Sequence, residues 1–384
     1  MSTPVRDQTV ATIPPEQTFQ PGERRFTYTQ WQLMWAKLKK HRLAMVSLII
    51  LSVFYLMAIF AEFVTPVPPT TRFAQYPLAP PQRLRFIDAE GEFHLRPFVY
   101  GYTPSVDPET FLRSYDVNTE ERYPVYLFVR SHPYEMWGLF EMRLHLFGIK
   151  DLEAPFFLLG SDGQGRDLFS RMIFASRISL SIGLIGVVMS FFLGILLGGL
   201  SGWYGGVVDT IIQRIVEILR SFPTLPLWMA LAAALPLDWP IIRTYFFITL
   251  ILSLIGWTGM ARVVRGKFLS LRSEEFVVAA EQAGARTGRI IFRHLLPSFM
   301  SHVIASATLS IPQMILAETA LSFLGVGLRP PAISWGVLLQ KAQNVQAISR
   351  TPWLLLPAVM VIVVVLAFNF LGDGLRDAAD PYRG

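Results

Sequence analysis

The sequence predicts an all-α polytopic membrane protein with six transmembrane helices and a small β-rich extracytoplasmic insertion between helices 1 and 2. Hydrophobic residues make up 52% of the 384-residue chain and charged residues only 16%, whereas soluble globular proteins carry roughly 25% charged residues. Six stretches are apolar over the ~20 residues that a helix needs to cross a bilayer. The segment between the first two of them instead contains short runs typical of strands.

The six apolar stretches are separated by connections rich in glycine, proline and charged residues. They are Leu43–Val64, Arg177–Gly202, Thr210–Leu235, Tyr245–Val264, Ser298–Gly325 and Trp353–Leu371. The third stretch is the least apolar, because charged residues such as Arg214 and Glu217 occupy its first turns. We expect it to begin as a helix on the cytoplasmic side and to enter the membrane near Phe222 and Pro223.

The distribution of Lys and Arg predicts the orientation, since cytoplasmic loops of membrane proteins carry the excess of these residues. Basic residues precede the first stretch, from Lys37 to Arg42, and gather again between the fourth and fifth. With six spans both clusters fall on one side, so both termini are predicted to be cytoplasmic. The predicted organisation is an N-terminal cytoplasmic tail (1–42), a first transmembrane helix (43–64), an extracytoplasmic insertion (65–167), a transmembrane domain (168–373) and a C-terminal cytoplasmic tail (374–384).

The basic charge of the chain does not indicate nucleic-acid binding. The net charge is +6 and the pI is near 9.6, but the basic residues lie beside apolar runs and form no contiguous stripe. Lipid is therefore the predicted surroundings of the chain, and no nucleic acid is predicted as a partner.

The predicted insertion is too long for a simple connection. Two runs of alternating or β-branched residues, Phe93–Tyr100 and Tyr123–Arg130, predict strands punctuated by glycine and proline. The chain contains no cysteine, so this region must fold on its own core without disulfides.

Small residues recur at every fourth position of the second stretch. They are Gly186, Ser190, Gly194, Gly198 and Gly202. This spacing places them on one helix face, where they let another helix backbone approach closely. We expect tight packing inside a bundle; a sliding surface is the alternative.

The connection between the fourth and fifth stretches, residues 267–295, is too long for a turn and is rich in helix-forming residues. Ser273 suits the cap of a first helix and Gly284 suits its end. A second helix is predicted from about Arg286 to Leu295, before Pro297.

This helix–glycine–helix element has two interpretations. It suits docking against a soluble cytoplasmic partner, because Ala279 and Ala280 form a smooth surface that a partner can approach closely. It also suits an amphipathic helix pair lying on the lipid headgroups.

Charged residues near the predicted cytoplasmic mouth also have two interpretations. Asp209, Arg214 and Glu217 lie early in the third stretch, and Asp373 and Arg376 follow the sixth. They form either an ion-pair network that holds the inner face closed or ordinary solvated helix ends, which contribute little to stability.

Glu318 differs from these residues because it falls within the apolar fifth stretch. A carboxylate inside a membrane is costly and is usually paired or lines a pathway. We consider two roles for Glu318, a structural pair with a neighbouring helix and a position facing the lumen of the pathway.

The sequence does not indicate an enzyme, a cofactor site or a metal site. None of the six histidines forms an H-E-x-x-H pair, no G-x-S-x-G elbow is present, and thiol chemistry is excluded without cysteine. A phosphate loop of the form G-x-x-x-x-G-K-[ST] is also absent, so ATP must bind elsewhere. A secondary transporter is the more distant alternative, but the ionisable midplane groups and internal repeats common in that class are not seen.

Several motifs resemble one family, the binding-protein-dependent ABC importer permeases. Ala279-Ala280, Gly284 and Leu296-Pro297 resemble the family's "EAA…G…LP" cytoplasmic loop. Further similar segments are Leu159–Asp167, Trp203–Gly206 with Asp209, Ser322–Gly325, Ser334–Gly336 and Gly372–Asp377. Together they resemble the C-type subunit of the dipeptide, oligopeptide and nickel branch, from about Leu159 to Pro381.

The resemblance implies a type I ABC importer permease of the bacterial or archaeal cytoplasmic membrane. Its partners would be a second homologous permease, two ATP-binding subunits and an extracytoplasmic substrate-binding protein, with ATP hydrolysis left to the ATP-binding subunits. Peptides are the first expected substrate; nickel complexes, opines and oligosaccharides are carried by similar permeases.

Two departures from the family pattern limit what the resemblance implies. Val278 stands where the loop usually has a glutamate, so a contact by that carboxylate is absent or is made by Glu274, Glu275 or Glu281. The insertion is also longer than in typical dipeptide permeases, which weakens any substrate borrowed from them.

Overall fold

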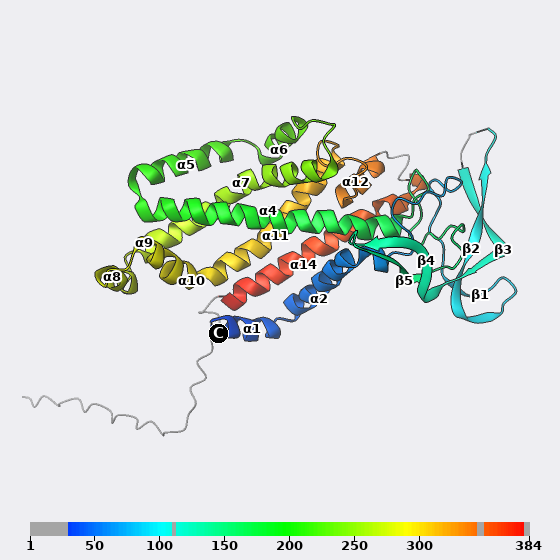
Figure 1. Cartoon of the computed structure of the whole chain (residues 1–384), viewed down its shortest axis with the longest axis horizontal. Helices are drawn as coiled ribbons and strands as arrows, with labels where there is room; N and C mark the ends of the chain where they lie inside the picture. Colours follow the sequence, from blue (N-terminus) through cyan, green and yellow to red (C-terminus); the bar gives the residue numbers. More distant parts are fainter. Residues whose placement is uncertain (1–29, 110–112, 344–348, 380–384) are drawn as a thin grey trace, which may run out of the picture.

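The computed structural model describes residues 30–109, 113–343 and 349–379. Long helices run side by side, with strands gathered at one end of the bundle and the short helices of the segment 272–299 at the other (Figure 1). Most of the predicted N-terminal tail, residues 1–29, and the last five residues, 380–384, lie outside the described part.

The helices follow the predicted apolar stretches but overrun several of their ends. In chain order the helical elements outside the segment 272–299 are α1 (Gln30–Lys40), α2 (Arg42–Ile59), α3 (Ala61–Val64), α4 (Leu168–Tyr204), α5 (Gly206–Ser221), α6 (Thr224–Ala233), α7 (Ile241–Leu271), α11 (Met300–Phe323), α12 (Trp335–Gln340), η2 (Lys341–Gln343), η3 (Pro352–Leu355) and α14 (Leu356–Ala379). Two of the predicted tails are therefore partly helical, since α1 lies within 1–42 and α14 continues past residue 373.

Within the described residues, five helices are long and apolar enough to cross a membrane: α2, α4, α7, α11 and η3–α14. A sixth crossing is obtained only if α5 and α6 count as one span, and these two helices meet at a bend of 87°. The break falls at Phe222 and Pro223, where the sequence places the entry into the membrane, because the proline ring cannot continue the α5 hydrogen-bond ladder.

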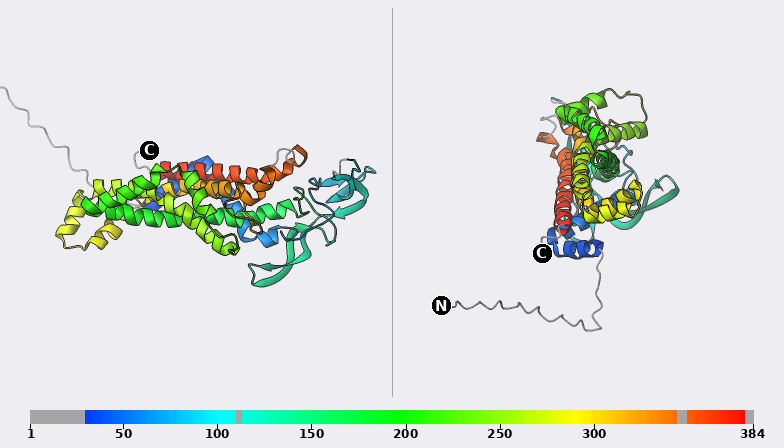
Figure 2. Two further views of the ribbon diagram at one scale, coloured as in Figure 1. Left: turned by 90° about the horizontal axis from the view of Figure 1, so that it is seen from above. Right: turned by 90° about the vertical axis from the view of Figure 1, so that its left-hand side faces the viewer.

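Helix α4 is the central element of the bundle and packs along α7 (Figures 1 and 2). The small-residue face of α4 makes this contact, which confirms the expected tight packing. A Cβ atom added at Gly194 would lie 2.6 Å from Cβ of Met260, and one added at Gly202 would lie 2.6 Å from Cβ of Phe268. Any larger residue at these two positions would push α4 away from α7.

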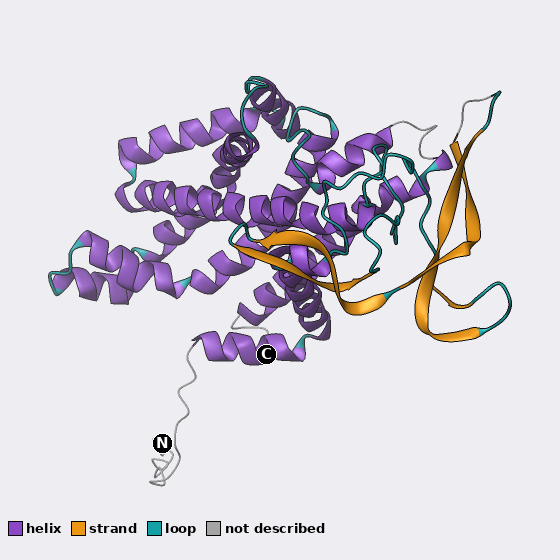
Figure 3. Ribbon diagram, turned by 45° about the vertical axis from the view of Figure 1, so that its right-hand side comes forward, coloured by secondary structure: helices purple, strands orange, loops and turns teal. Residues whose placement is uncertain are grey.

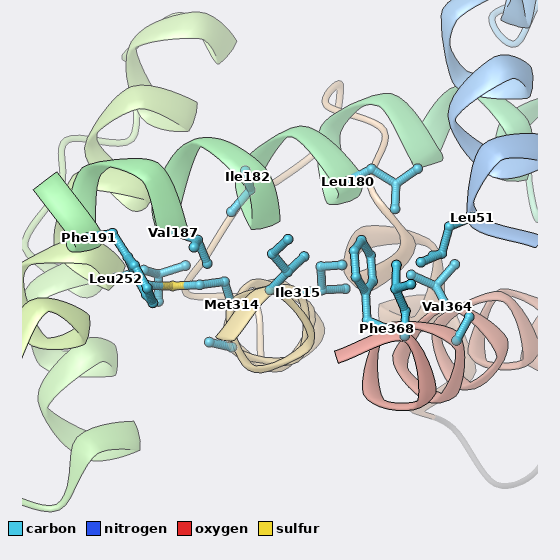
Figure 4. Packing of buried hydrophobic residues seen from close by; sticks show 14 of the residues in the cluster. Leu51, Leu180, Ile182, Val187, Phe191, Leu252, Met314, Ile315, Val364 and Phe368 are labelled. Atoms are coloured by element: carbon cyan, nitrogen blue, oxygen red, sulfur yellow. The ribbon is translucent and has the colours of Figure 1, made fainter. Parts of the chain in front are cut away.

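Apolar side chains fill the space between α4, α7, α11, α14 and α2 (Figure 4). Ile182 and Leu252 are fully buried, and Ile315 of α11 lies between α4 and the α14 residue Phe368. Many other apolar side chains of the same helices remain exposed on the outside of the bundle, as expected where lipid replaces water.

The strands that the structure describes form two separate antiparallel sheets (Figure 3). One has the order β1-β2-β3, with β1 Arg85–Ile87, β2 Phe93–Val106 and β3 Arg113–Pro124, and the other pairs β4 Tyr126–Met136 with β5 Phe140–Gly148. The registers place Phe98 opposite Pro124 and Tyr126 opposite Gly148.

The second predicted strand, Tyr123–Arg130, is wrong as a single element, because it straddles the junction between the two sheets. Strand β3 ends at Pro124 and β4 begins at Tyr126. The backbone N–H of Val125 between them donates to the carbonyl of Pro97 at 2.8 Å. The side chain of Val125 is buried in a small cluster with Val99 and Phe156.

The strand-rich region is attached to the helices by hydrogen bonds, such as the one from the Trp137 indole N–H to the carbonyl of Ile59 at 2.8 Å, and an ion pair beside it joins α4 to α3. The Arg177 guanidinium on α4 donates to both carboxylate oxygens of Glu62 on α3 and to the carbonyl of Ala58 at 2.6 Å. The Trp353 indole N–H donates to the carbonyl of Ser161 at 3.1 Å. The insertion is thus anchored at the end of the bundle where α2 ends and α4 begins.

Candidate functional site

The helix–glycine–helix element between α7 and α11 lies at the end of the bundle away from the strands (Figure 1). Its parts are α8 (Glu275–Gln282), α9 (Thr287–Arg289), the π-helix η1 (Ile290–Leu295) and α10 (Leu296–Ser298). We call residues 272–299 the connecting segment. The first five residues of the predicted 267–295 range, up to Leu271, belong to α7.

The first helix of the connecting segment begins and ends close to the predicted residues. Its N-cap is Glu274 and not Ser273, and no side-chain cap bond is present there. Gly284 follows the helix with φ of +77°, a left-handed conformation that suits a residue without Cβ, so it is the predicted helix stop.

The connecting segment is held to the bundle by three fully buried side chains, those of Val277, Ile290 and Leu295. A further contact joins it to α7, where the rings of Phe299 and Phe268 meet edge to face with centroids 6.0 Å apart. The segment is therefore a packed element with a fixed place on the bundle.

Three large apolar side chains of the connecting segment are exposed, beside exposed charged residues such as Glu275 and Arg293. Phe276 is 43% exposed, Val278 is 39% exposed and Phe292 is 67% exposed. Exposed apolar side chains of this kind suit contact with another protein and also contact with lipid headgroups.

The two alanines of the motif lie differently. Ala279 is exposed, whereas Ala280 is half-buried and packs against the main core. Of the other motif residues, Leu296 is half-buried against the same core and Pro297 is exposed. The accessible part of the motif is therefore Ala279, Gly284 and Pro297.

Asp209 at the start of α5 is paired with Arg265 of α7, a residue that the sequence analysis counted only as part of a basic cluster. The Arg265 Nε–H donates to Asp209 Oδ1 at 2.6 Å and its Nη2–H to Oδ2 at 2.5 Å. Ser201 of α4 also donates to Asp209. This pair joins three helices at the end that carries the connecting segment.

The remaining charged candidates are not joined into one network. Arg214 and Glu217 form an exposed pair within α5 at 3.0 Å. Asp373 and Arg376 are exposed on the last turns of α14. Among the residues that the structure describes, no ion pair links the α5 group with Asp373 or Arg376.

Glu318 of α11 is fully buried and hydrogen-bonded. Ser179 of α4 donates to its Oε2 at 3.2 Å and Ser322 donates to its Oε1 at 2.8 Å. The same two hydroxyls accept the backbone N–H groups of Trp335 at 3.2 Å and Leu328 at 3.0 Å. Glu318 thus ties α4 and α11 to the segment that carries α12, as a structural pair with a neighbouring helix does.

Among the described residues of the strand-rich region, Asp88, Glu92 and His94 form one cluster with metal-ligand spacing. Arg122 lies within it, with Nη1 2.7 Å from His94 Nε2 and 3.3 Å from Asp88 Oδ2. The hydrogen bond from His94 holds the pKa of Asp88 below its usual value. The guanidinium already occupies the place of a cation, so the geometry is that of an ion pair.

These features define a helical integral membrane protein with a packed helical segment at one end and a β-rich region at the other. The family of binding-protein-dependent transport system inner membrane components matches residues 172–383. The N-terminal transmembrane domain of oligopeptide transport permease C matches residues 29–81. The chain therefore belongs to the binding-protein-dependent ABC importer permeases, as the sequence motifs predict.

One curated relative extends the similarity over nearly the whole chain, and others match a little more than half of it. The dipeptide transport system permease protein DppC of Alkalihalophilus pseudofirmus is 32% identical over 96% of this chain and 95% of its own length. The oligopeptide transport system permease protein OppC of Bacillus subtilis is 38% identical over 58% of this chain and 70% of its own length. The oligopeptide transport system permease protein OppC of Escherichia coli K12 is 41% identical over 60% of this chain and 74% of its own length.

Among solved structures, inward-facing conformations of the MetNI methionine ABC transporter align with a TM-score of 0.41 at 18% identity, over 54% of this chain and 96% of that chain. A similarity at this level adds nothing to the assignment.

Proposed function

We propose that this chain forms half of the translocation pathway of an ATP-driven importer for peptides of the dipeptide and oligopeptide class, delivered by an extracytoplasmic binding protein. The observation that carries the proposal is family membership combined with the names of the relatives, which are dipeptide and oligopeptide permease subunits. The chain itself is a transport subunit and not an enzyme, and ATP is hydrolysed by separate subunits.

The proposed topology has six spans in the cytoplasmic membrane, with α5 and α6 together forming the bent third span. Both termini and the connecting segment are cytoplasmic, and residues 65–167 are extracytoplasmic. The positions of the strands and of the connecting segment at opposite ends of the bundle support this arrangement (Figure 1), as does the excess of Lys and Arg around α1 and α7.

The connecting segment is the proposed contact with an ATP-binding subunit. Ala279, Gly284 and the exposed apolar side chains Phe276 and Phe292 form the contact surface, while Ala280 and Leu296 hold the surface in place. Closure of the two ATP-binding subunits around ATP moves this segment, and the two permeases then exchange between inward- and outward-facing states. ATP shifts this equilibrium because it binds one state more tightly.

The charged residues at the cytoplasmic end act in the same exchange. Asp209 with Arg265 is the proposed inner pair that holds α5 against α7. Arg214, Glu217, Asp373 and Arg376 are exposed in the isolated chain, so they contribute to a gate only through residues of the second permease.

The test of the proposed function is purification of the chain from its native membrane followed by mass spectrometry and an uptake assay in proteoliposomes. We expect one homologous permease and nucleotide-binding subunits to copurify, and ATP-dependent uptake of a labelled peptide once the binding protein is added. A chain that purifies alone and transports without ATP would overturn the proposal in favour of a secondary transporter.

A further inference from the structure

A cavity of about 300 Å³ lies in the middle of the helix bundle. Its walls come from the midpoints of α4, α7 and α11, at Val187 to Phe191, Ile255 to Gly259 and Ser310 to Met314. Figure 4 shows Val187, Phe191 and Met314 at this level of the bundle. The fourth wall is the break between α5 and α6, so the cavity sits at the depth where the third span is interrupted.

The polar groups that line the cavity offer mainly hydrogen-bond donors. Arg220 contributes a guanidinium, Gln313 an amide and Trp228 an indole N–H. The Trp228 Nε1 atom is buried and finds no partner within the described ranges 30–109, 113–343 and 349–379. The hydroxyls of Ser310 and Thr258 already donate to backbone carbonyls, at 2.9 Å and 2.8 Å.

The charge of the lining is positive. Arg220 is the cationic residue of the lining, and none of its residues is a carboxylate. Across the cavity the Arg220 Nη1 atom lies 4.0 Å from the place of a Cβ atom built on Gly259 of α7. The Arg220 side chain is exposed in the isolated chain, at the level of the midpoints of α4, α7 and α11, and an arginine at such a depth of a membrane protein marks a pathway for anionic groups.

The helix break adds to the same charge. Helix α6 begins at Thr224, a residue of the cavity wall, and has no side-chain cap at its N-terminus. The N-terminal N–H groups of a helix attract anions. In transporters with interrupted spans, the ends of the half-helices bind the anionic groups of substrates.

We propose that Arg220, assisted by Gln313, Trp228 and the first turn of α6, binds the C-terminal carboxylate of a peptide during its passage through this cavity. The inference rests on the proposed function of the chain. A guanidinium and a carboxylate match in two parallel hydrogen bonds, and the other donors hold the adjacent peptide carbonyl. The cavity is large enough for the last residue of a peptide but not for a whole oligopeptide. It therefore binds the C-terminal end of the substrate and does not contact the rest.

The experiment compares uptake of labelled tetra-alanine with uptake of its C-terminal amide by the purified importer in proteoliposomes with its binding protein. The quantity measured is the ratio of acid to amide uptake rates. Because the same binding protein delivers both peptides to every variant, its own preference cancels when the ratios of two variants are compared. Wild type, Arg220→Gln, Arg220→Lys and the control Arg243→Gln are measured, since Arg243 is exposed, stacks on Trp239 and lies outside the cavity lining.

We expect Arg220→Gln to lower the acid-to-amide ratio on the order of tenfold, as the loss of hydrogen bonds to a charged group does. Arg220→Lys should keep part of the preference, and Arg243→Gln should keep all of it. An unchanged ratio in Arg220→Gln overturns the inference. Absence of ATP-dependent peptide uptake in the wild type would instead refute the proposed function, so the two failures are distinguishable.

A second variant covers the case in which Arg220→Gln does not assemble. Gly259→Asp places a carboxylate next to the intact Arg220, because the Cβ position at Gly259 already lies 4.0 Å from its Nη1 atom. This internal anion should occupy the guanidinium and abolish the acid-to-amide preference, whereas Gly259→Asn should preserve it. Equal ratios for the Asp and Asn variants would overturn the inference.

Discussion

Replacement of Glu318 by leucine provides a test of whether this residue is structural or lines the pathway. Leucine is close to glutamate in volume, so the substitution leaves little cavity. The change in stability therefore reports mainly the loss of the hydrogen bonds to the carboxylate. The hydroxyls of Ser179 and Ser322 lose the acceptor that they reach at 3.2 Å and 2.8 Å. Glutamine at the same place keeps one acceptor oxygen and serves as the conservative control.

The expected cost follows from the burial of the site. Glu318 is 0% exposed, and a buried donor left without an acceptor costs about 1–3 kcal/mol. With two such donors, Glu318→Leu should lower the free energy of unfolding by roughly 2–6 kcal/mol. We expect the lower end of this range, because a serine in a helix can donate instead to the carbonyl one turn back. For Glu318→Gln we expect the free energy of unfolding to fall by about 1 kcal/mol. For the exposed control Leu316→Ala we expect a smaller loss.

The assay is thermal unfolding of the purified complex in detergent, followed by the fraction that remains monodisperse, together with peptide uptake. We expect Glu318→Leu to unfold several degrees below wild type and Glu318→Gln to lie between them, with uptake falling in proportion to the folded fraction. If Glu318→Leu is as stable as wild type but transports no peptide, the residue acts in the pathway and the structural role is refuted.

Three further predictions concern the two ends of the bundle. The pKa of Asp167, the buried N-cap of α4, is raised to about 6 by burial. The folded state therefore favours the neutral carboxyl, and the stability that this gives is lost as the pH rises from about 4 through 6. Asp167→Asn should raise the free energy of unfolding at pH 7 by up to roughly 3 kcal/mol and flatten the pH dependence of thermal unfolding. Arg177→Lys should lower the free energy of unfolding by about 1–2 kcal/mol, because one ammonium cannot replace the guanidinium that donates to Glu62 and to the α2 carbonyls. The 31% exposure of the Arg177 side chain reduces this effect. Unchanged thermal unfolding would contradict the prediction. Ala279→Glu should lower ATPase stimulation by substrate several-fold at unchanged expression, whereas Ala89→Glu, the same change in an exposed turn of the outer sheet, should not; equal stimulation in both would exclude Ala279 from the contact surface.

The helices could be predicted from the sequence because their signals are local. Length and hydropathy set the spans, and a proline marks the break at Pro223 before α6 begins at Thr224. Gly284 ends α8 for an equally local reason, since its φ of +77° favours a residue without Cβ.

The partners of the charged residues could not be predicted, because they depend on tertiary packing. Asp209 and Arg265 are 56 residues apart in the chain, and Ser179 and Glu318 are 139 residues apart. The prediction of a single strand at Tyr123–Arg130 was wrong for a related reason. The alternation of the sequence continues through Val125, but the Val125 side chain is buried in a small cluster at the junction of the two sheets.

The length of α4 has a mechanical consequence. Its 37 residues form a rod of about 55 Å, well beyond the ~30 Å hydrocarbon core of a bilayer. Near one end Arg177 pairs with Glu62 of α3, beside the β-rich region, and the other end lies beside the Asp209–Arg265 pair. A tilt of only about 5° carries one end of such a lever through roughly 5 Å relative to the other. A small rotation at either surface of the membrane is therefore transmitted to the opposite surface as a displacement large enough to make or break contacts.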